Sequence, residues 1–188
     1  MKKLLTLAAM AILAACNSNS PASTTDLAAS KPDSSAMAKT IQSPYEISYS
    51  SKFVMDEPKN AETLLAIWKA YDNGDLSVSK DLFADTVEAQ LGDGSRMRTS
   101  RDTMLVAVQA MRNSFKSAVD RVAAVMAVKS TDKNEHWVLI WGTETDTYKN
   151  GKVDSTELQE TWRFNKDGKA NFVLQYKKPA MPPMRSKK

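Results

Sequence analysis

The chain has 188 residues, with 26 Lys and Arg, 22 Asp and Glu and one His, which gives a net charge of +4 at neutral pH. The positive charge lies at the ends, because Lys2, Lys3 and the five basic residues after Tyr176 leave 19 basic against 22 acidic residues in between. We therefore expect no basic face for nucleic acid and no nucleic-acid partner. The single cysteine, Cys16, excludes a disulfide framework within the chain and thiolate zinc sites.

The start of the chain is typical of a signal peptide. Two lysines precede an uncharged apolar run over residues 4–15, which is shorter than the about 20 apolar residues of a membrane-spanning helix. The run ends in "LAAC", residues 13–16, which resembles the lipobox of bacterial lipoproteins. In that family the peptide is cut before the cysteine, which then carries the lipids. We predict a lipoprotein signal peptide over residues 1–15 and lipidation at Cys16, with a plain secretory signal as the alternative.

Composition divides the rest of the chain. Residues 16–43, rich in Ser, Ala, Thr and Pro, are predicted to form a flexible tether behind the lipidated cysteine. Residues 44–177 suit a single domain, and residues 178–188 form a basic tail that is disordered or touches anionic lipid headgroups. Acylation, by palmitate among other chains, would anchor the domain to the cell envelope. Asn17 rather than aspartate after the cysteine favours the outer membrane, with the domain facing the periplasm or the exterior.

The first half of the domain has helical periodicity. Four apolar residues recur at the spacing of an amphipathic helix: Leu64, Ile67, Trp68 and Tyr71. Gly74 is suited to end this helix. A shorter helix is predicted over residues 76–83, and a third begins after the N-cap residue Ser100. The stripe predicted for the third helix comprises Met104, Leu105, Val108, Met111 and Phe115.

The second half of the domain changes to a period of two. Strands are predicted over residues 121–130, 135–148, 155–164 and 170–176. Asn150-Gly151 and Asp167-Gly168 predict tight hairpin turns, and an earlier strand precedes the Gly-Asp-Gly turn at residues 92–94. Helices come first and an antiparallel meander comes last. This order predicts an α+β fold in which a curved sheet covers a small set of helices.

Two segments resemble a known family. The runs "YDNGDLSVSKDLFAD", residues 71–85, and "ETWRFNKDGKANFVLQY", residues 160–176, are similar to the SnoaL-like group. That group belongs to the superfamily of nuclear transport factor 2, ketosteroid isomerase and scytalone dehydratase. The resemblance implies a cone-shaped, mixed and mostly antiparallel β-sheet wrapped on three N-terminal helices, with a pocket at its open end. The superfamily includes enzymes, binding proteins and transport factors, so the resemblance leaves the activity open.

The resemblance to ketosteroid isomerases tests one activity. In those enzymes a base aspartate moves the proton, while a tyrosine and a protonated acid stabilise the oxyanion. In this chain, Ile67 aligns with the tyrosine and Ala89 aligns with the base aspartate. Only Glu160, which aligns with the protonated acid, is a residue of the same chemical type. Steroid isomerisation is therefore not predicted. The only histidine, His136, also excludes the histidine pair of scytalone dehydratase, and we interpret it as a structural or interface residue.

Glu160 lies in the alternating run "LQETWRF", which places it on one face of a strand with Leu158, Trp162 and Phe164. A buried carboxylate must be neutral, hydrogen-bonded, paired or hydrated. Three roles remain open: a satisfied polar group or a group at the pocket rim, an anchor for a ligand, and a general acid or base. In the preceding strand, the resemblance places Trp141, with Trp137, Leu139 and Thr143, towards the pocket.

The residues expected to line a pocket are Trp68, Tyr71, Met111, Phe115, Trp141, Glu160, Trp162 and Tyr176, unless they simply fill a core. No metal site and no cofactor are predicted. The first hypothesis is a binding module for a small apolar or amphipathic molecule. The second is an isomerase-, cyclase- or dehydratase-like enzyme using Glu160. The third is a module that forms homodimers through an outer sheet face of Gln159, Thr161 and Arg163 beside His136 and Val138.

Overall fold

The computed structural model describes residues 41–180, which all belong to one unit, Ser34–Lys188. The predicted signal peptide, Cys16, nearly all of the predicted tether and most of the predicted tail lie outside the described residues. In the described part of the chain, no helix has the length and apolar character needed to cross a membrane.

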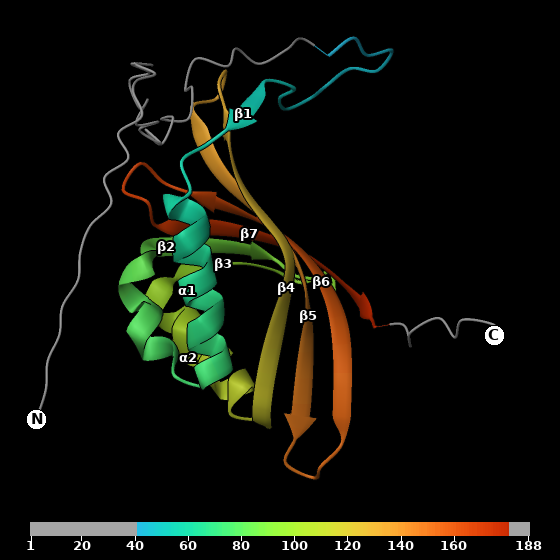
Figure 1. The fold of residues 1–188 in the computed structure, drawn as a ribbon. Coiled ribbons are helices and arrows are strands. Elements are labelled where there is room, and N and C mark those ends of the chain that lie inside the picture. Colours follow the sequence, from blue (N-terminus) through green and yellow to red (C-terminus); the bar gives the residue numbers. More distant parts are fainter. Residues whose placement is uncertain (1–40, 181–188) are drawn as a thin grey trace, which may run out of the picture. The chain divides into compact units, whose positions relative to one another are not determined.

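After β1, which was not predicted, helices and strands follow the predicted order, with one seven-stranded sheet beside the helices (Figure 1). The elements are β1 (Phe53–Met55), α1 (Lys59–Asn73), the 3₁₀ helix η1 (Leu76–Leu82), β2 (Phe83–Gln90), β3 (Arg96–Ser100), α2 (Arg101–Arg112), β4 (Phe115–Ser130), β5 (Glu135–Tyr148), β6 (Val153–Phe164) and β7 (Ala170–Pro179). The strand order is β1-β4-β5-β6-β7-β2-β3, and β2 with β7 is the parallel pair. The predicted α+β fold with a mixed, mostly antiparallel sheet is confirmed.

The helix boundaries follow from their capping residues. Gly74 ends α1 in the left-handed conformation with φ 78°, which a residue without a Cβ adopts easily. Ser100 begins α2 by accepting a hydrogen bond from the Thr103 amide at 3.2 Å. The predicted stripe was wrong at its last two positions: Met111 lies within α2 but is 53% exposed, and Phe115 starts β4 because the helix ends at Arg112. Phe115 follows Met111 at helical spacing, but it belongs to β4, which begins six residues earlier than predicted.

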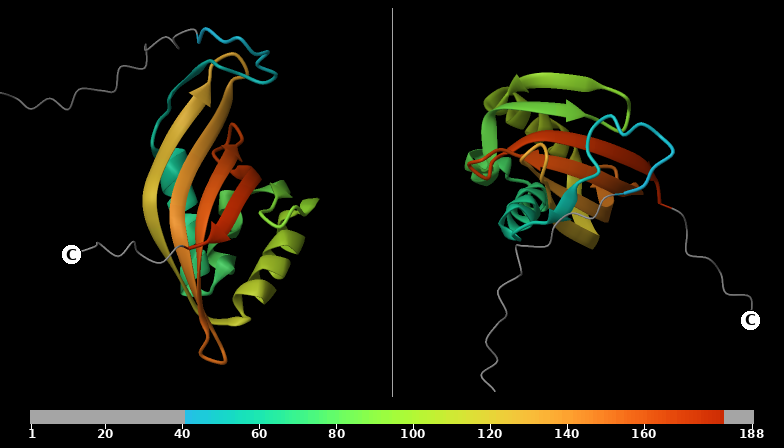
Figure 2. Two further views of the ribbon diagram at one scale, coloured as in Figure 1. Left: turned by 90° about the vertical axis from the view of Figure 1, so that its right-hand side faces the viewer. Right: turned by 90° about the horizontal axis from the view of Figure 1, so that it is seen from above.

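Both long helices lie on the concave side of the bent sheet, and β4, β5 and β6 continue past the helix ends (Figure 2). The core forms where the helices cover this face. It includes Leu64, Ile67, Trp68, Phe83, Val87, Met104, Val138, Ile140, Leu158, Trp162 and Phe164. All the residues of β6 predicted to share a face with Glu160 are buried in this core, as the alternation of the run indicated.

The predicted orientation of β5 was wrong. Val138 and Ile140 have no exposed surface and belong to the concave core. Their neighbours Trp137, Leu139 and Trp141 therefore point to the convex face, because successive side chains of a strand alternate. Both faces of β5 are rich in apolar residues, so the alternation predicted the strand but could not decide which face turns inward. His136 and Val138 consequently do not share the outer face with Gln159 and Arg163.

Candidate functional site

Glu160 lies at the centre of the concave face and is 5% exposed. Its Oε2 atom accepts hydrogen bonds from the indole N–H of Trp68 at 3.0 Å and of Trp162 at 2.8 Å. Its Oε1 atom accepts a third from the Gln175 amide at 2.8 Å. These donors come from α1, from β6 itself and from the residue directly opposite on β7. The carboxylate is thus held by three separate elements of the fold.

A close approach of α1 to the sheet makes this arrangement possible. Gly142 of β5 lies under the Trp68 indole, where an added Cβ would be 2.9 Å from the ring and 2.8 Å from the Arg121 carbonyl oxygen. A side chain at this position would push the tryptophan away from the sheet and away from Glu160. The tryptophan, the glycine and the glutamate therefore depend on one another.

The three donors decide what Glu160 can do. Burial raises its pKa, while the hydrogen bonds from Gln175, Trp162 and Trp68 lower it. Every hydrogen bond described for the carboxyl group is one that it accepts from an N–H, so the ionised form is fully satisfied. The group already has its partners within the fold. We conclude that Glu160 joins α1 to the sheet, and that its side chain is not free to hold a ligand.

A second group of acids lies on the same face, near the end where α1 and α2 terminate. We call it the carboxylate cluster, and it consists of Asp72, Asp120, Glu144 and Asp146. Asp120 of β4 is directly opposite Glu144 of β5, and Asp146 is two residues further along the same face of β5. Asp72, at the end of α1, accepts a hydrogen bond from the Asp120 backbone amide at 2.9 Å. The helix end and the two strands thus bring four acids together.

Within the cluster, burial and neighbouring acids raise the pKa values of two carboxyl groups. Burial, the charge of Asp146 and a hydrogen bond to it raise the pKa of Glu144 to about 8. Burial, the charge of Asp72 and a hydrogen bond to it raise the pKa of Asp120 to about 7. Near neutral pH the cluster therefore retains protons that solvent-exposed carboxyl groups would have lost, and they belong to the coupled acids together rather than to one residue. Glu160 adds to the raised pKa of both groups through its charge.

Arg112 and Tyr71 complete the surroundings of the cluster. Arg112 is 6% exposed and donates to the last carbonyls of α1, from Nε to Tyr71 O at 2.7 Å and from a terminal nitrogen to Asp72 O at 3.0 Å. Its charge lowers the pKa of Asp146, which burial raises. Burial and the charges of Glu144 and Asp146 raise the pKa of the Tyr71 hydroxyl above its ordinary value. A phenol that stays protonated thus lies beside the acids.

Two acceptor atoms of the cluster have no hydrogen-bond partner in the described part of the chain, Asp120 Oδ1 and Asp146 Oδ1. Both atoms are buried, and Asp146 as a residue is only 9% exposed. Buried acceptors without a partner cost about 1–3 kcal/mol each. The cluster is therefore a place where stability is given up, which is common at functional sites. No group of His, Cys, Asp and Glu among residues 41–180 is suited to hold a metal ion.

No protein-family model and no curated protein matches the sequence. Solved structures match the fold. A LEH-like epoxide hydrolase of M. tuberculosis matches with a TM-score of 0.54 at 13% identity, covering 64% of this chain and 83% of that one. A putative polyketide cyclase of Xanthomonas campestris matches with a TM-score of 0.50 at 17% identity, covering 63% and 89%. An NTF2-like protein of unknown function from an Exiguobacterium species matches with a TM-score of 0.50 at 16% identity, covering 62% and 98%.

The chain has an NTF2-like fold. Identities this low establish the architecture alone, so the activity must be argued from the residues of this NTF2-like domain.

The residues predicted to line a pocket do not form one group. Trp68, Trp162 and Glu160 meet in the core, while Tyr71 lies beside the carboxylate cluster. Phe115 packs edge-on against Tyr148, with ring centroids 5.0 Å apart. Met111 is exposed on α2.

Trp141 and Tyr176 lie outside the concave face of the NTF2-like domain. Both pair with Gln159 of β6, which faces the convex side opposite to Glu160, and Tyr176 is 60% exposed. The prediction that they line the same pocket as Glu160 was wrong, because the concave face of β5 is formed by the even-numbered residues.

Sequence reasoning missed the carboxylate cluster. Glu144 and Asp146 alternate with threonines in "TETDTY", a pattern that is typical of a solvent-facing strand. Asp120 lies before the strand that was predicted from residue 121 onward. The sequence does contain one signal: Glu144 and Asp146 have the same parity as Val138 and Ile140, so an inward assignment of those residues also turns the acids inward.

Proposed function

We propose that this chain is a lipid-anchored protein of the bacterial cell envelope whose NTF2-like domain binds a small amphipathic molecule beside the carboxylate cluster. The observation that carries the proposal is the buried Asp146 oxygen without a partner, next to Glu144 and the Tyr71 hydroxyl. A basic or hydroxyl group of a ligand would supply the missing donor. Phe115 and Tyr148, packed against each other at the same end of β4 and β5, offer an apolar surface for the rest of the molecule.

The site differs from the one that the sequence suggested. Glu160 was the expected anchor, but its two oxygens are occupied by Trp68, Trp162 and Gln175. The anchoring role passes to Glu144 and Asp146, which lie four and six residues along β5 from Ile140, the residue directly opposite Glu160.

Native mass spectrometry of the full chain from its host envelope tests the binding proposal. We expect wild-type protein to carry a small molecule that is lost in Glu144→Gln and Asp146→Asn. Glu62→Gln, which removes an exposed acid of α1, should retain it. Wild-type protein that consistently carries no small molecule, or variants that retain it, would overturn the proposal.

The same measurement tests the anchor. An acylated Cys16 adds the mass of its lipid chains, and Cys16→Ser should lose that mass and release the protein from the membrane fraction. Outer-membrane attachment, proposed from Asn17, is tested by fractionation of the envelope. Recovery of wild-type protein without lipid would contradict the anchor but not the binding site.

Proton-transfer catalysis is a second candidate, favoured by the pKa of Glu144 near 8 and of Asp120 near 7. Such a pair can supply an acid and a base at neutral pH. Two of the matching solved structures are described as an epoxide hydrolase and a putative polyketide cyclase. A panel of small epoxides is a suitable screen. We expect turnover with a bell-shaped pH profile whose limbs lie near 7 and 8, lost in Asp120→Asn but not in Glu62→Gln. Absence of turnover across the panel would leave binding as the function.

Homodimer formation is a further proposal, supported by a row of side chains across the convex face. Trp141, Gln159 and Tyr176 are directly opposite one another on β5, β6 and β7, and Tyr176 is largely exposed. Light scattering at increasing concentration should show a dimer that Tyr176→Lys weakens. A monomer at all concentrations would exclude it.

A further inference from the structure

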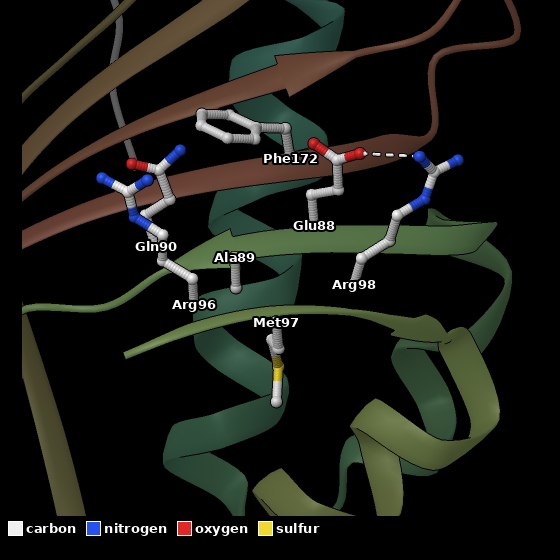
Figure 3. A pocket seen from close by; sticks show the side chains of 7 residues that line it. All are labelled: Glu88, Ala89, Gln90, Arg96, Met97, Arg98 and Phe172. Carbon is white, nitrogen blue, oxygen red and sulfur yellow. Dashed lines mark ion pairs between the residues drawn. The ribbon is translucent and has the colours of Figure 1, made fainter. Parts of the chain in front are cut away.

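The convex side of the sheet contains a hollow that is separate from the carboxylate cluster. It has a volume of about 290 Å³ and lies over β2, β3 and β7 (Figure 3). It is lined by Glu88, Ala89, Gln90, Arg96, Met97, Arg98 and Phe172. Sites for small molecules begin at about 300 Å³, so this volume suits a compound with one or two rings.

The register of the strands places the polar groups around the hollow. Gln90 is directly opposite Arg96, and Glu88 is directly opposite Arg98. Figure 3 shows these four side chains on the same side of the strands as the Phe172 ring, while Met97 points to the other side. Two guanidinium groups, one amide and one carboxylate thus lie on the same side of the strands as the aromatic ring.

The charges in the hollow are not balanced. Glu88 pairs with Arg98 at 3.3 Å, and the Arg96 guanidinium forms no ion pair with the described part of the chain. Within residues 41–180, no side-chain hydrogen bond is described for Arg96 or Gln90. A guanidinium and an amide that face each other across a strand pair can both donate to one carboxylate.

The aromatic ring in the hollow is held in place from behind. Phe172 packs edge-on against Trp137, with ring centroids 6.0 Å apart, and the Arg163 guanidinium lies 5.5 Å from its centroid. Arg163 is itself fixed by a hydrogen bond to Asn171 at 3.2 Å. A ring that is fixed on one side can stack with a planar group on the other at little cost in side-chain entropy.

We propose that this hollow is a second binding site, specific for a small organic anion that carries a planar apolar ring. The anionic group binds Arg96 and Gln90, and the ring lies against Phe172. The site is opposite in charge to the carboxylate cluster and lies on the other face of the sheet, so the two sites take different molecules.

Titration of the full chain with 2-naphthoate, followed by calorimetry and by NMR, tests this proposal. We expect saturable binding that shifts the signals of Gln90, Arg96 and Arg98. Arg96→Gln should weaken it about fivefold, because one charge-assisted contact is lost from an exposed position. The matched control is Arg121→Gln, which removes another exposed arginine, on β4, and should leave binding unchanged.

Two further probes test the two halves of the ligand. The neutral 2-naphthamide and inorganic phosphate should each bind at least about fivefold more weakly than 2-naphthoate, since one lacks the charge and the other the ring. Equal binding of either probe, equal loss in the Arg96 and Arg121 variants, or shifts confined to other regions would overturn the proposal. Glu144→Gln should not change naphthoate binding, so failure here is distinguishable from failure of the concave site.

Discussion

Glu160 and Glu144 face the same side of the sheet, one at the centre of β6 and the other near the end of β5, but their surroundings differ. Glu160 accepts three hydrogen bonds from neutral N–H donors on three elements. Glu144 has other acids as its neighbours, and its pKa rises to about 8. Burial alone would raise the pKa of either group, so the partners make the difference. An acid with N–H donors is part of the fold, whereas an acid among acids is available for protons and ligands.

The largest expected effect on stability comes from replacing Glu160, whose carboxylate accepts three hydrogen bonds. Glu160→Ala should lower the free energy of unfolding by about 3–5 kcal/mol, because it leaves a void and two buried indole N–H groups without acceptors. Glu160→Gln keeps the volume but sets an amide among donors, and should cost about 1–3 kcal/mol. Urea denaturation measures both. Gln159→Ala, on the exposed side of the same strand, is the control and should stay within about 0.5 kcal/mol. A loss below 1 kcal/mol for Glu160→Ala would show that the carboxylate does not hold α1.

The next effect concerns Arg112, which connects α2 to the end of α1 beside the cluster. Arg112→Met should cost about 2–3 kcal/mol, because two charge-assisted hydrogen bonds to the Tyr71 and Asp72 carbonyls are lost from a buried position. The pKa of Asp146 should rise further, since Arg112 lowers it in the wild type. Denaturation and NMR titration of the carboxyl carbons measure the two effects. Arg121→Met is the exposed control, and equal losses in both variants would contradict the role.

Glu144→Gln should change how the free energy of unfolding depends on pH. The folded pKa of about 8 lies above the value in the unfolded chain, so ionising this group destabilises the fold as pH rises from about 5 to 8. Asp120 contributes in the same direction up to about pH 7. Glu144→Gln should therefore flatten the decline and be more stable than the wild type at pH 8 by on the order of 1–2 kcal/mol, with little difference near pH 5. Urea denaturation of the wild type and of Glu144→Gln from pH 5 to pH 8 tests this prediction, with Glu62→Gln as the control. An unchanged slope would mean that Glu144 does not hold a proton near neutrality.

Much of the fold could be predicted from local patterns. The 3.6-residue spacing of α1, the glycine that ends it and the two hairpin turns are properties of short segments. The burial of Glu160 followed from the alternation of β6, since only one side of that strand is apolar. The β5 strand shows the limit, because Trp137 and Trp141 are as apolar as Val138 and Ile140. A pattern with two apolar faces cannot indicate which face meets the helices.

The candidate site could not be predicted for a related reason. Its acids come from the end of α1 and from β4 and β5, and they meet only through strand register. Taken singly, each acid lies in a polar stretch that is typical of an exposed strand or a helix end. The sequence singled out Glu160 because it is an acid in an apolar run. The same apolar surroundings contain the two tryptophans that donate hydrogen bonds to it. An unusual residue in a core pattern indicated a satisfied group rather than a reactive one.

The smallest expected effect on stability is that of Gln175→Met, which tests whether the partners of Glu160 distinguish it from Glu144. Gln175→Met removes one of the three donors to Glu160 and keeps the side-chain volume, so it should cost about 1 kcal/mol at neutral pH. The hydrogen bond from Gln175 lowers the pKa of Glu160, so its loss should raise that pKa further. An acid whose folded pKa is raised loses stability as pH rises, and the defect of Gln175→Met should therefore be larger at pH 8 than at pH 5. Gln159→Met, exposed on β6, should show neither effect. A defect that is independent of pH would mean that Glu160 keeps one protonation state throughout, and that its contrast with Glu144 is one of position rather than of partners.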